Sequence, residues 1–165
     1  MTSLPDSPPG GTPAVAGARF GHLNLTGTNW VRLATFYRDV FGCQPVPPER
    51  DYGGAGLDAG TGLVDAHLTG IHLRLPGHGE DGPTLEIYRY DALREHPGPA
   101  VDRPGWGHIA FQVPDVAAAA EAVVAAGGRR VGEVVTLETA DGRRVTWCYT
   151  TDPEGNIVEL QAWSG

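Results

Sequence analysis

Apolar and polar residues alternate in two short stretches of the chain that resemble each other. The stretch FGHLNL begins at Phe20 and the stretch WGHIAF begins at Trp106. Each contains an aromatic residue, a glycine and a histidine, followed by alternating apolar positions. Such alternation is typical of a β-strand with one buried face. The histidines, His22 and His108, fall on the face opposite the large apolar residues.

A helical pattern follows each of these strands. In NWVRLATFYRDVFG apolar residues recur every three or four positions, and DVAAAAEAVVAAGG is rich in alanine, the strongest helix former. A glycine stop signal ends each pattern. It lies 20 residues after the strand histidine in both cases, in the pairs His22–Gly42 and His108–Gly128. This spacing indicates an internal repeat.

Further strands complete each half of the repeat. They are predicted at GIHLRLP and TLEIYRY in the first half, and at RVGEVVTL, RVTWCYTTD and IVELQAW in the second. The segment 47–66 is interpreted as a long loop, with its glycine-rich part, residues 53–62, as a candidate lid. The pattern predicts an α+β fold with an N-terminal tail (1–18), a first strand–helix–strands unit (19–92), a linker (93–104) and a second such unit (105–165).

The last strand of each half carries a carboxylate at a corresponding place, Glu86 in LEIYRY and Glu159 in VELQAW. Strand alternation places both on the more polar face, as it does His22 and His108. If the halves pair about a pseudo-twofold axis, these four side chains meet near one centre. Two imidazoles with two carboxylates suit a divalent ion such as Zn, Ni, Co, Mn or Fe(II), and leave coordination positions for a chelating substrate.

The alternative is that these residues are structural, because a strand histidine is often only hydrogen-bonded and a strand glutamate only salt-bridged. The matching register of the two halves favours the metal site. Other polar or aromatic side chains near this face are candidate substrate contacts, namely His72, Arg74, Tyr88, Gln112 and Trp106. Glu154, in DPEGN, is interpreted as a turn residue.

Composition excludes several classes of partner. The chain has 20 acidic and 12 basic residues and a formal charge of −8, so no basic patch favours nucleic acid or an anionic membrane. No apolar run reaches the roughly 20 residues of a membrane span, and the N-terminal residues lack the features of a secretory signal. With only Cys43 and Cys148, a disulfide framework is not expected. We therefore expect a cytoplasmic protein that binds a small molecule.

The motifs GHLNL, LATFYRDVFG, WGHIAFQV and DPEGNIVELQAW resemble the vicinal oxygen chelate superfamily, over residues 20–163. That superfamily includes glyoxalase I, methylmalonyl-CoA epimerase, extradiol dioxygenases, and bleomycin- and fosfomycin-resistance proteins. The resemblance implies two tandem βαβββ modules that form an incomplete eight-stranded mixed barrel, with helices outside, around one divalent metal ion. It implies the ligands His22 and Glu86 from the first module, and His108 and Glu159 from the second.

Within the superfamily, one histidine and one glutamate per module look most like glyoxalase I. The epimerase usually carries Gln where this chain has Glu86, and extradiol dioxygenases need a further histidine after His108 that this chain lacks. The resemblance implies a metal-dependent lyase or isomerase that abstracts a proton beside a metal-bound oxygen and forms an enediolate. Glu159 would be the base and Glu86 its counterpart on the other face. A metal-independent antibiotic-binding protein is the alternative, and a homodimer is expected by analogy.

Overall fold

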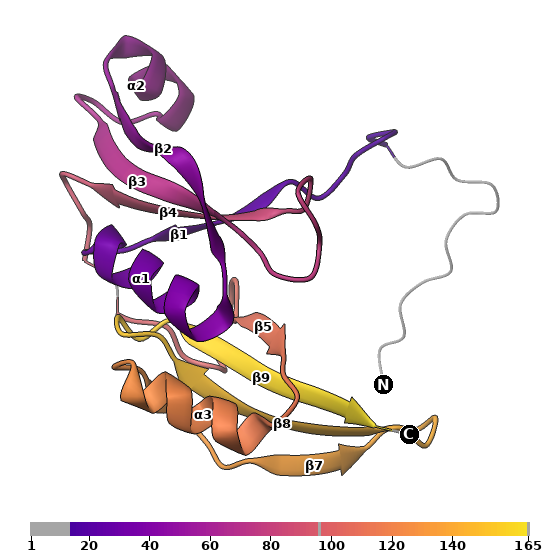
Figure 1. Cartoon of the computed structure of the whole chain (residues 1–165). Helices are drawn as coiled ribbons and strands as arrows, with labels where there is room; N and C mark the ends of the chain where they lie inside the picture. The colour runs from indigo at the N-terminus through magenta and orange to yellow at the C-terminus, as the bar shows by residue number, and fades with distance from the viewer. Residues whose placement is uncertain (1–13, 96, 165) are drawn as a thin grey trace.

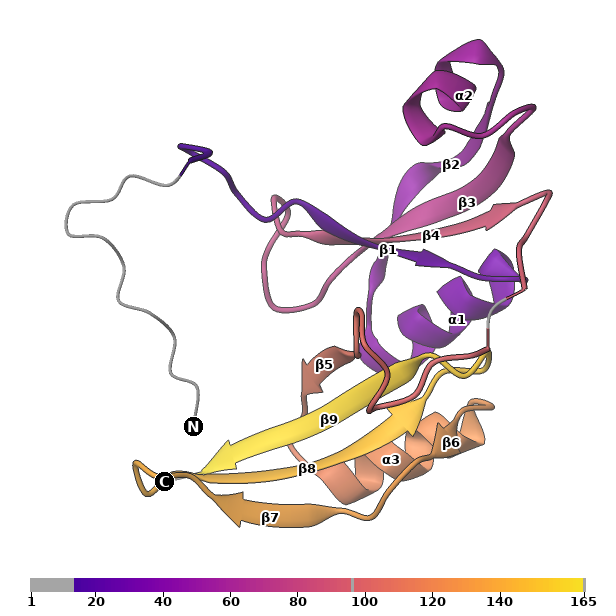
Figure 2. The same cartoon turned by 180° about the vertical axis from the view of Figure 1, so that it is seen from behind.

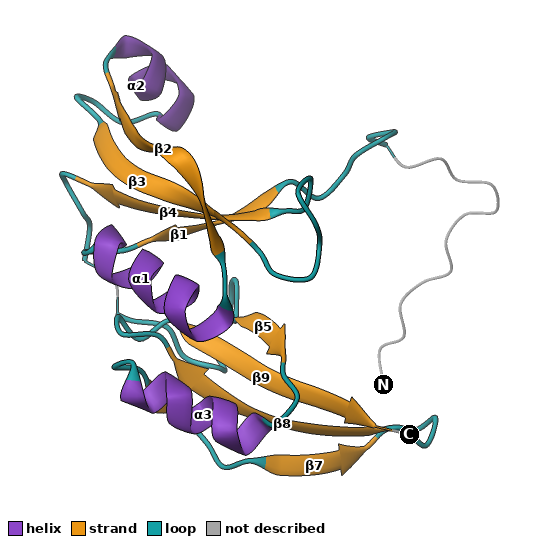
Figure 3. Ribbon diagram, in the orientation of Figure 1, coloured by secondary structure: helices purple, strands orange, loops and turns teal. Residues whose placement is uncertain are grey.

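The computed structural model describes residues 14–95 and 97–164. Most of the predicted N-terminal tail therefore lies outside the described residues, as does residue 96 of the predicted linker. The described residues form two β-sheets and three helices, which confirms the α+β class (Figure 3). None of these helices is long and apolar enough to cross a membrane.

Each sheet contains strands from one half of the sequence. Sheet A has the strand order β1-β4-β3-β2, and sheet B has the order β5-β9-β8-β6, with β7 also paired to β8. Strand β1 runs parallel to β4 and strand β5 runs parallel to β9, whereas all the other strand pairs are antiparallel. The described residues close no barrel. The elements are β1 (His22–Thr26), α1 (Trp30–Phe41), β2 (Gln44–Gly53), α2 (Ala55–Thr61), β3 (His67–Arg74), β4 (Thr84–Tyr90), β5 (Ile109–Gln112), α3 (Val116–Ala125), β6 (Arg129–Arg130), β7 (Val135–Glu138), β8 (Arg144–Thr151) and β9 (Ile157–Ser164).

The two predicted long helices are confirmed, and their ends follow from local chemistry. The Asn29 side chain accepts a hydrogen bond from the backbone N–H of Arg32 and so caps the N-terminus of α1. Gly42 ends that helix in the left-handed conformation, with φ 71°. Asp115 caps α3 in the same way as Asn29 caps α1, by accepting from Ala118.

Helix α1 lies between the two sheets, and α3 packs against sheet B (Figures 1 and 2). Leu33, Phe36 and Tyr37 on α1 are buried in one core that contains side chains from both sheets. The rings of Phe41 and Phe111 stack across this junction with centroids 4.0 Å apart. The apolar faces of the two sheets are therefore joined through α1.

The DPEGN turn between β8 and β9 also joins the halves. Glu154 accepts hydrogen bonds from the backbone N–H groups of Thr28 and Asn29, both at 2.7 Å, and from the Thr28 hydroxyl. The fully buried Asp152 accepts one from the Tyr37 hydroxyl at 3.1 Å. Glu154 thus lies in a turn, as predicted, but it also binds the start of α1. The sequence could not show this contact, because its partners are more than 120 residues away.

The interpretation of residues 47–66 as one long loop is wrong. Much of this segment lies in β2, an edge strand paired with β3, and in the short helix α2. Pro47 and Pro48 concealed the strand, since proline is tolerated only at sheet edges or irregularities, and the pairing register does shift between Val46 and Arg50. A second correction concerns His108, which directly precedes β5 rather than lying inside it.

Candidate functional site

The face of each sheet that its helix does not cover carries one histidine–glutamate pair. In sheet A, Leu23 pairs with Leu85, so His22 comes one residue before that pair and Glu86 one residue after it. The His22 Nε2 atom lies 3.5 Å from Glu86 Oε2. Because successive side chains of a strand point to opposite faces, both point away from the core that holds the two leucines. We call this the helix-free face of sheet A.

His72 adds a second imidazole to Glu86. It is the register partner of Glu86 on β3, and its Nε2 atom lies 3.3 Å from Glu86 Oε1 and 2.6 Å from the Tyr88 hydroxyl. Burial lowers the pKa of His72, although the Glu86 charge opposes this effect. Burial, followed by the charge of Glu86, raises the pKa of Tyr88 to about 12. Both oxygens of Glu86 are therefore engaged by imidazoles.

Sheet B repeats the pair with the same register. Ile109, which follows His108, pairs with Val158, which precedes Glu159. The His108 Nε2 atom lies 2.8 Å from Glu159 Oε2. Tyr149, the register partner of Glu159, places its ring 5.2 Å from the His108 ring. Burial, followed by the charge of Glu159, raises the pKa of this tyrosine.

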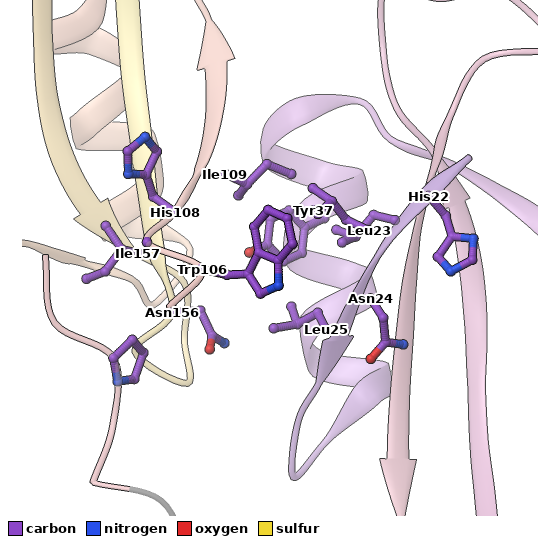
Figure 4. A pocket seen from close by; sticks show the side chains of 13 residues that line it. His22, Leu23, Asn24, Leu25, Tyr37, Trp106, His108, Ile109, Asn156 and Ile157 are labelled. Carbon is purple, nitrogen blue, oxygen red and sulfur yellow. The ribbon is translucent and has the colours of Figure 1, made fainter. Parts of the chain in front are cut away.

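A pocket of about 410 Å³ lies between the two halves, and both His22 and His108 line it. Figure 4 shows the two imidazoles on opposite sides, with Leu23, Ile109 and Trp106 between them. Trp106 is 96 % exposed, so its indole is available to a ligand. Gln112 lines a neighbouring hollow of about 740 Å³, which also includes His108.

The two pairs are not gathered into one cluster. His22 and Glu86 belong to sheet A, whereas His108 and Glu159 lie on sheet B. Within residues 14–95 and 97–164, no group of three or more His, Cys, Asp or Glu side chains is arranged to hold a metal ion. The donor types nevertheless fit a divalent cation, because each pair offers an imidazole and a carboxylate that lie side by side on one sheet.

The helix-free face of sheet B is also aromatic, a feature that the sequence analysis largely missed. Trp147 packs edge-on to Tyr149, with ring centroids 5.0 Å apart, and alternation places Trp163 on the same face. Strand alternation in RVTWCYTTD places Trp147 and Tyr149 on one face, and could have revealed the feature.

A third histidine site lies at the end of sheet A next to α2. His67 Nε2 lies 2.8 Å from Asp51, and its Nδ1 lies 2.9 Å from Asp91. These two hydrogen bonds raise the pKa of His67. Each ring nitrogen faces a different carboxylate, so the cluster links β2, β3 and the end of β4.

The comparisons with known proteins agree with this architecture. The model of the glyoxalase-like domain matches residues 23–160. The chain belongs to the glyoxalase-like domain family. It is thereby a member of the glyoxalase/bleomycin resistance/dioxygenase, or vicinal oxygen chelate, superfamily. No curated protein matches the chain.

Solved structures of low sequence identity share the fold. A glyoxalase family protein from Bacillus cereus has a TM-score of 0.79 at 18% identity, covering 94% of this chain and 100% of its own. A family enzyme from Burkholderia phytofirmans PsJN has a TM-score of 0.54 at 16% identity, covering 88% and 98%. The fosfomycin resistance protein FosX of Listeria monocytogenes has a TM-score of 0.52 at 17% identity, covering 88% and 93%. Another crystal structure of FosX contains Mn(II) and sulfate.

Proposed function

We propose that this protein is a divalent-metal-dependent lyase or isomerase of the glyoxalase I-like type. One observation carries the proposal: both sheets present a histidine and a glutamate on their helix-free faces, in one register, across a parallel strand pair. The pair is kept in both halves although the residues beside it on β3 and β8 differ, which favours a shared chemical role for the pair. The proposed ligands are His22, Glu86, His108 and Glu159.

A bound divalent ion would supply a Lewis acid that polarises a substrate oxygen. The protein groups would then move a proton on the adjacent carbon. Glu159 Oε2 faces His108, which leaves its Oε1 free to accept that proton, whereas both oxygens of Glu86 face imidazoles. We therefore assign the base to Glu159 and the return of the proton to Glu86. An epimerase-like reaction would use the same two steps.

One ion can bind all four ligands only if the two faces meet. We propose that the protein is a homodimer in which sheet A of one copy faces sheet B of the other, as in two paired βαβββ modules of an incomplete barrel. In support, the two pairs of one chain lie on separate sheets and do not form a common cluster. The site would then need a second copy of the chain.

Metal content by elemental mass spectrometry tests the proposed metal site. We expect about one divalent ion per chain, lost in His108→Ala and in Glu159→Gln but kept in Glu133→Gln, which makes the same chemical change at an exposed site. With substrates of glyoxalase I or the epimerase, Glu159→Gln should lower turnover by about 10²–10⁴-fold. Wild-type protein that stays metal-free and refuses added ions would contradict the proposal.

Mixing two inactive variants tests whether two copies of the chain form each site. If each site joins two copies, a mixture of Glu86→Gln and Glu159→Gln chains contains heterodimers with one intact site, and part of the activity should return. If each site lies within one chain, every site in the mixture carries a substitution and no activity should return. Sedimentation of the unmixed protein measures the dimer itself.

A second function is favoured by the aromatic face of sheet B. Trp147, Tyr149 and Trp163 could bind a flat aromatic compound without any metal, as in a drug-binding resistance protein. Metal-free wild-type protein that still binds aromatic antibiotics, and loses that binding in Trp147→Ala, would favour this second function.

A further inference from the structure

Arg74 lies in the row of sheet A that contains His22. Its partner on β4 is Thr84, and Thr84 is also the partner of His22 on β1. Arg74 follows His72 by two positions on β3, so alternation places the two on the same helix-free face. Relative to Glu86, Arg74 is a diagonal neighbour, and such pairs are typically about 7–8 Å apart.

Among residues 14–95 and 97–164, no hydrogen-bond partner explains the position of the Arg74 Nε atom. This Nε atom is buried. Of the buried side-chain nitrogen and oxygen atoms in the described residues, it is the one that makes no hydrogen bond. In contrast, Arg38, Arg130 and Arg143 each pair with a carboxylate, in a protein that has an excess of acidic residues. A buried donor without a partner destabilises the folded protein, because it loses its hydrogen bond to water and gains none in return. An anionic ligand would remove this cost.

The chemistry of the orphan atom indicates the type of anion. The Nε and the adjacent Nη of a guanidinium present two parallel N–H groups, which a planar carboxylate accepts with both oxygens. Glu86 does not fill this role, because its oxygens face His22 and His72. Arg50 adds a second positive charge to this part of the face, and its charge contributes to the lowered pKa of His72.

We propose that Arg74 is the carboxylate-binding residue of sheet A, and that the ligand is a small carboxylic acid with a second oxygen function near the His22–Glu86 pair. The carboxylate subsite stands on Arg74 alone, whereas the role of the second oxygen rests on the proposed metal-dependent function. A 2-hydroxy or 2-oxo acid has the required chemistry, since its two oxygen functions lie on adjacent carbons.

Binding to the metal-stripped full-length protein tests the subsite separately from the metal. Calorimetry and ligand-observed NMR would compare 2-hydroxybutyrate with its uncharged amide, and with inorganic phosphate as another anion. We expect the acid to bind more tightly than the amide and the phosphate. Arg74→Gln should weaken binding of the acid by about 10- to 100-fold, and Arg74→Lys by less, since lysine keeps the charge but loses the planar fork.

Arg144→Gln is the matched control, because Arg144 is exposed on β8 and far from this row of sheet A. Its affinity for the acid should equal that of the wild type, and thermal melting would show that all variants are folded. Equal binding of acid and amide, phosphate binding as tight as the acid, or full affinity in Arg74→Gln would overturn the proposal. If the protein as purified contains no divalent ion and takes up none when ions are added, but still binds the acid through Arg74, the subsite is kept and the metal-dependent function is rejected.

Discussion

The helix-free faces of the two sheets share a skeleton but differ in chemistry. Beside Glu86, β3 carries His72, with Gly70 and Arg74 two positions to either side. The corresponding residues beside Glu159 on β8 are Tyr149, with Trp147 and Thr151. Sheet A therefore has an imidazole and a guanidinium beside its carboxylate, whereas sheet B has two aromatic rings beside its own.

The two halves share the histidine–glutamate pair and differ in the residues beside it. The histidine–glutamate pair recurs because the repeat places it in the same register of both sheets. The neighbouring positions diverge, so a ligand between such faces would meet charge on one side and flat apolar surface on the other. The pair is therefore the candidate for the chemistry, and the neighbouring residues are candidates for specificity.

The largest effect is expected where the two halves are joined. Asp152 is fully buried and accepts hydrogen bonds from Tyr37, Glu154 and Asn156. Asp152→Ala would leave the buried Tyr37 hydroxyl and three part-buried donors unpaired, and we expect the free energy of unfolding to fall by about 3 kcal/mol or more. Urea denaturation measures the loss. Asp141→Ala, in an exposed turn of sheet B, should lower the free energy of unfolding far less, because solvent screens its ion pair with Arg143. Equal losses in both variants would show that the join adds no stability.

A smaller effect should distinguish the two faces directly. A Cβ at Gly70 would meet the backbone carbonyl of Ile87 and the Tyr88 ring, although the equivalent position in sheet B accepts Trp147. Gly70→Ala should therefore lower the free energy of unfolding by about 1–3 kcal/mol. Gly60→Ala, in α2 with open space around it, should leave stability unchanged or raise it by up to about 1 kcal/mol. If Gly70→Ala left the free energy of unfolding unchanged, sheet A would accommodate a side chain at this position, as sheet B accommodates Trp147.

The smallest effect concerns pH and belongs to sheet A. The pKa of His67 is raised by Asp51 and Asp91, and Arg89 also faces Asp91. The protonated form is therefore stabilised by folding. This stabilisation is fully present below the unfolded pKa of about 6.5 and is lost as the pH rises through the folded pKa.

His67→Asn should accordingly reduce the free energy of unfolding more at pH 5.5 than at pH 8.5. Urea denaturation of both proteins at each pH measures this difference. His78→Asn is the control, because His78 lies in an exposed loop and makes no ion pair with the described residues. A reduction that is the same at both pH values would remove His67 from this role.

The sequence by itself determined the elements that depend on local periodicity. The alternation around His22 and His108 placed each histidine opposite the core, and the apolar spacing after Asn29 located α1, with its glycine stop at Gly42. The motif DPEGN and its neighbours led to the superfamily. These features are fixed by residues that are neighbours in the chain, so a single sequence reveals them.

Only the tertiary structure decided which distant residues meet. It made an edge strand of β2, whose hydrogen-bond partners lie on β3, and it directed Glu154 to the start of α1. It also kept the two histidine–glutamate pairs on separate sheets and buried Arg74 Nε without a partner. Each of these depends on packing between segments that are far apart in sequence, and periodicity carries no information about such contacts.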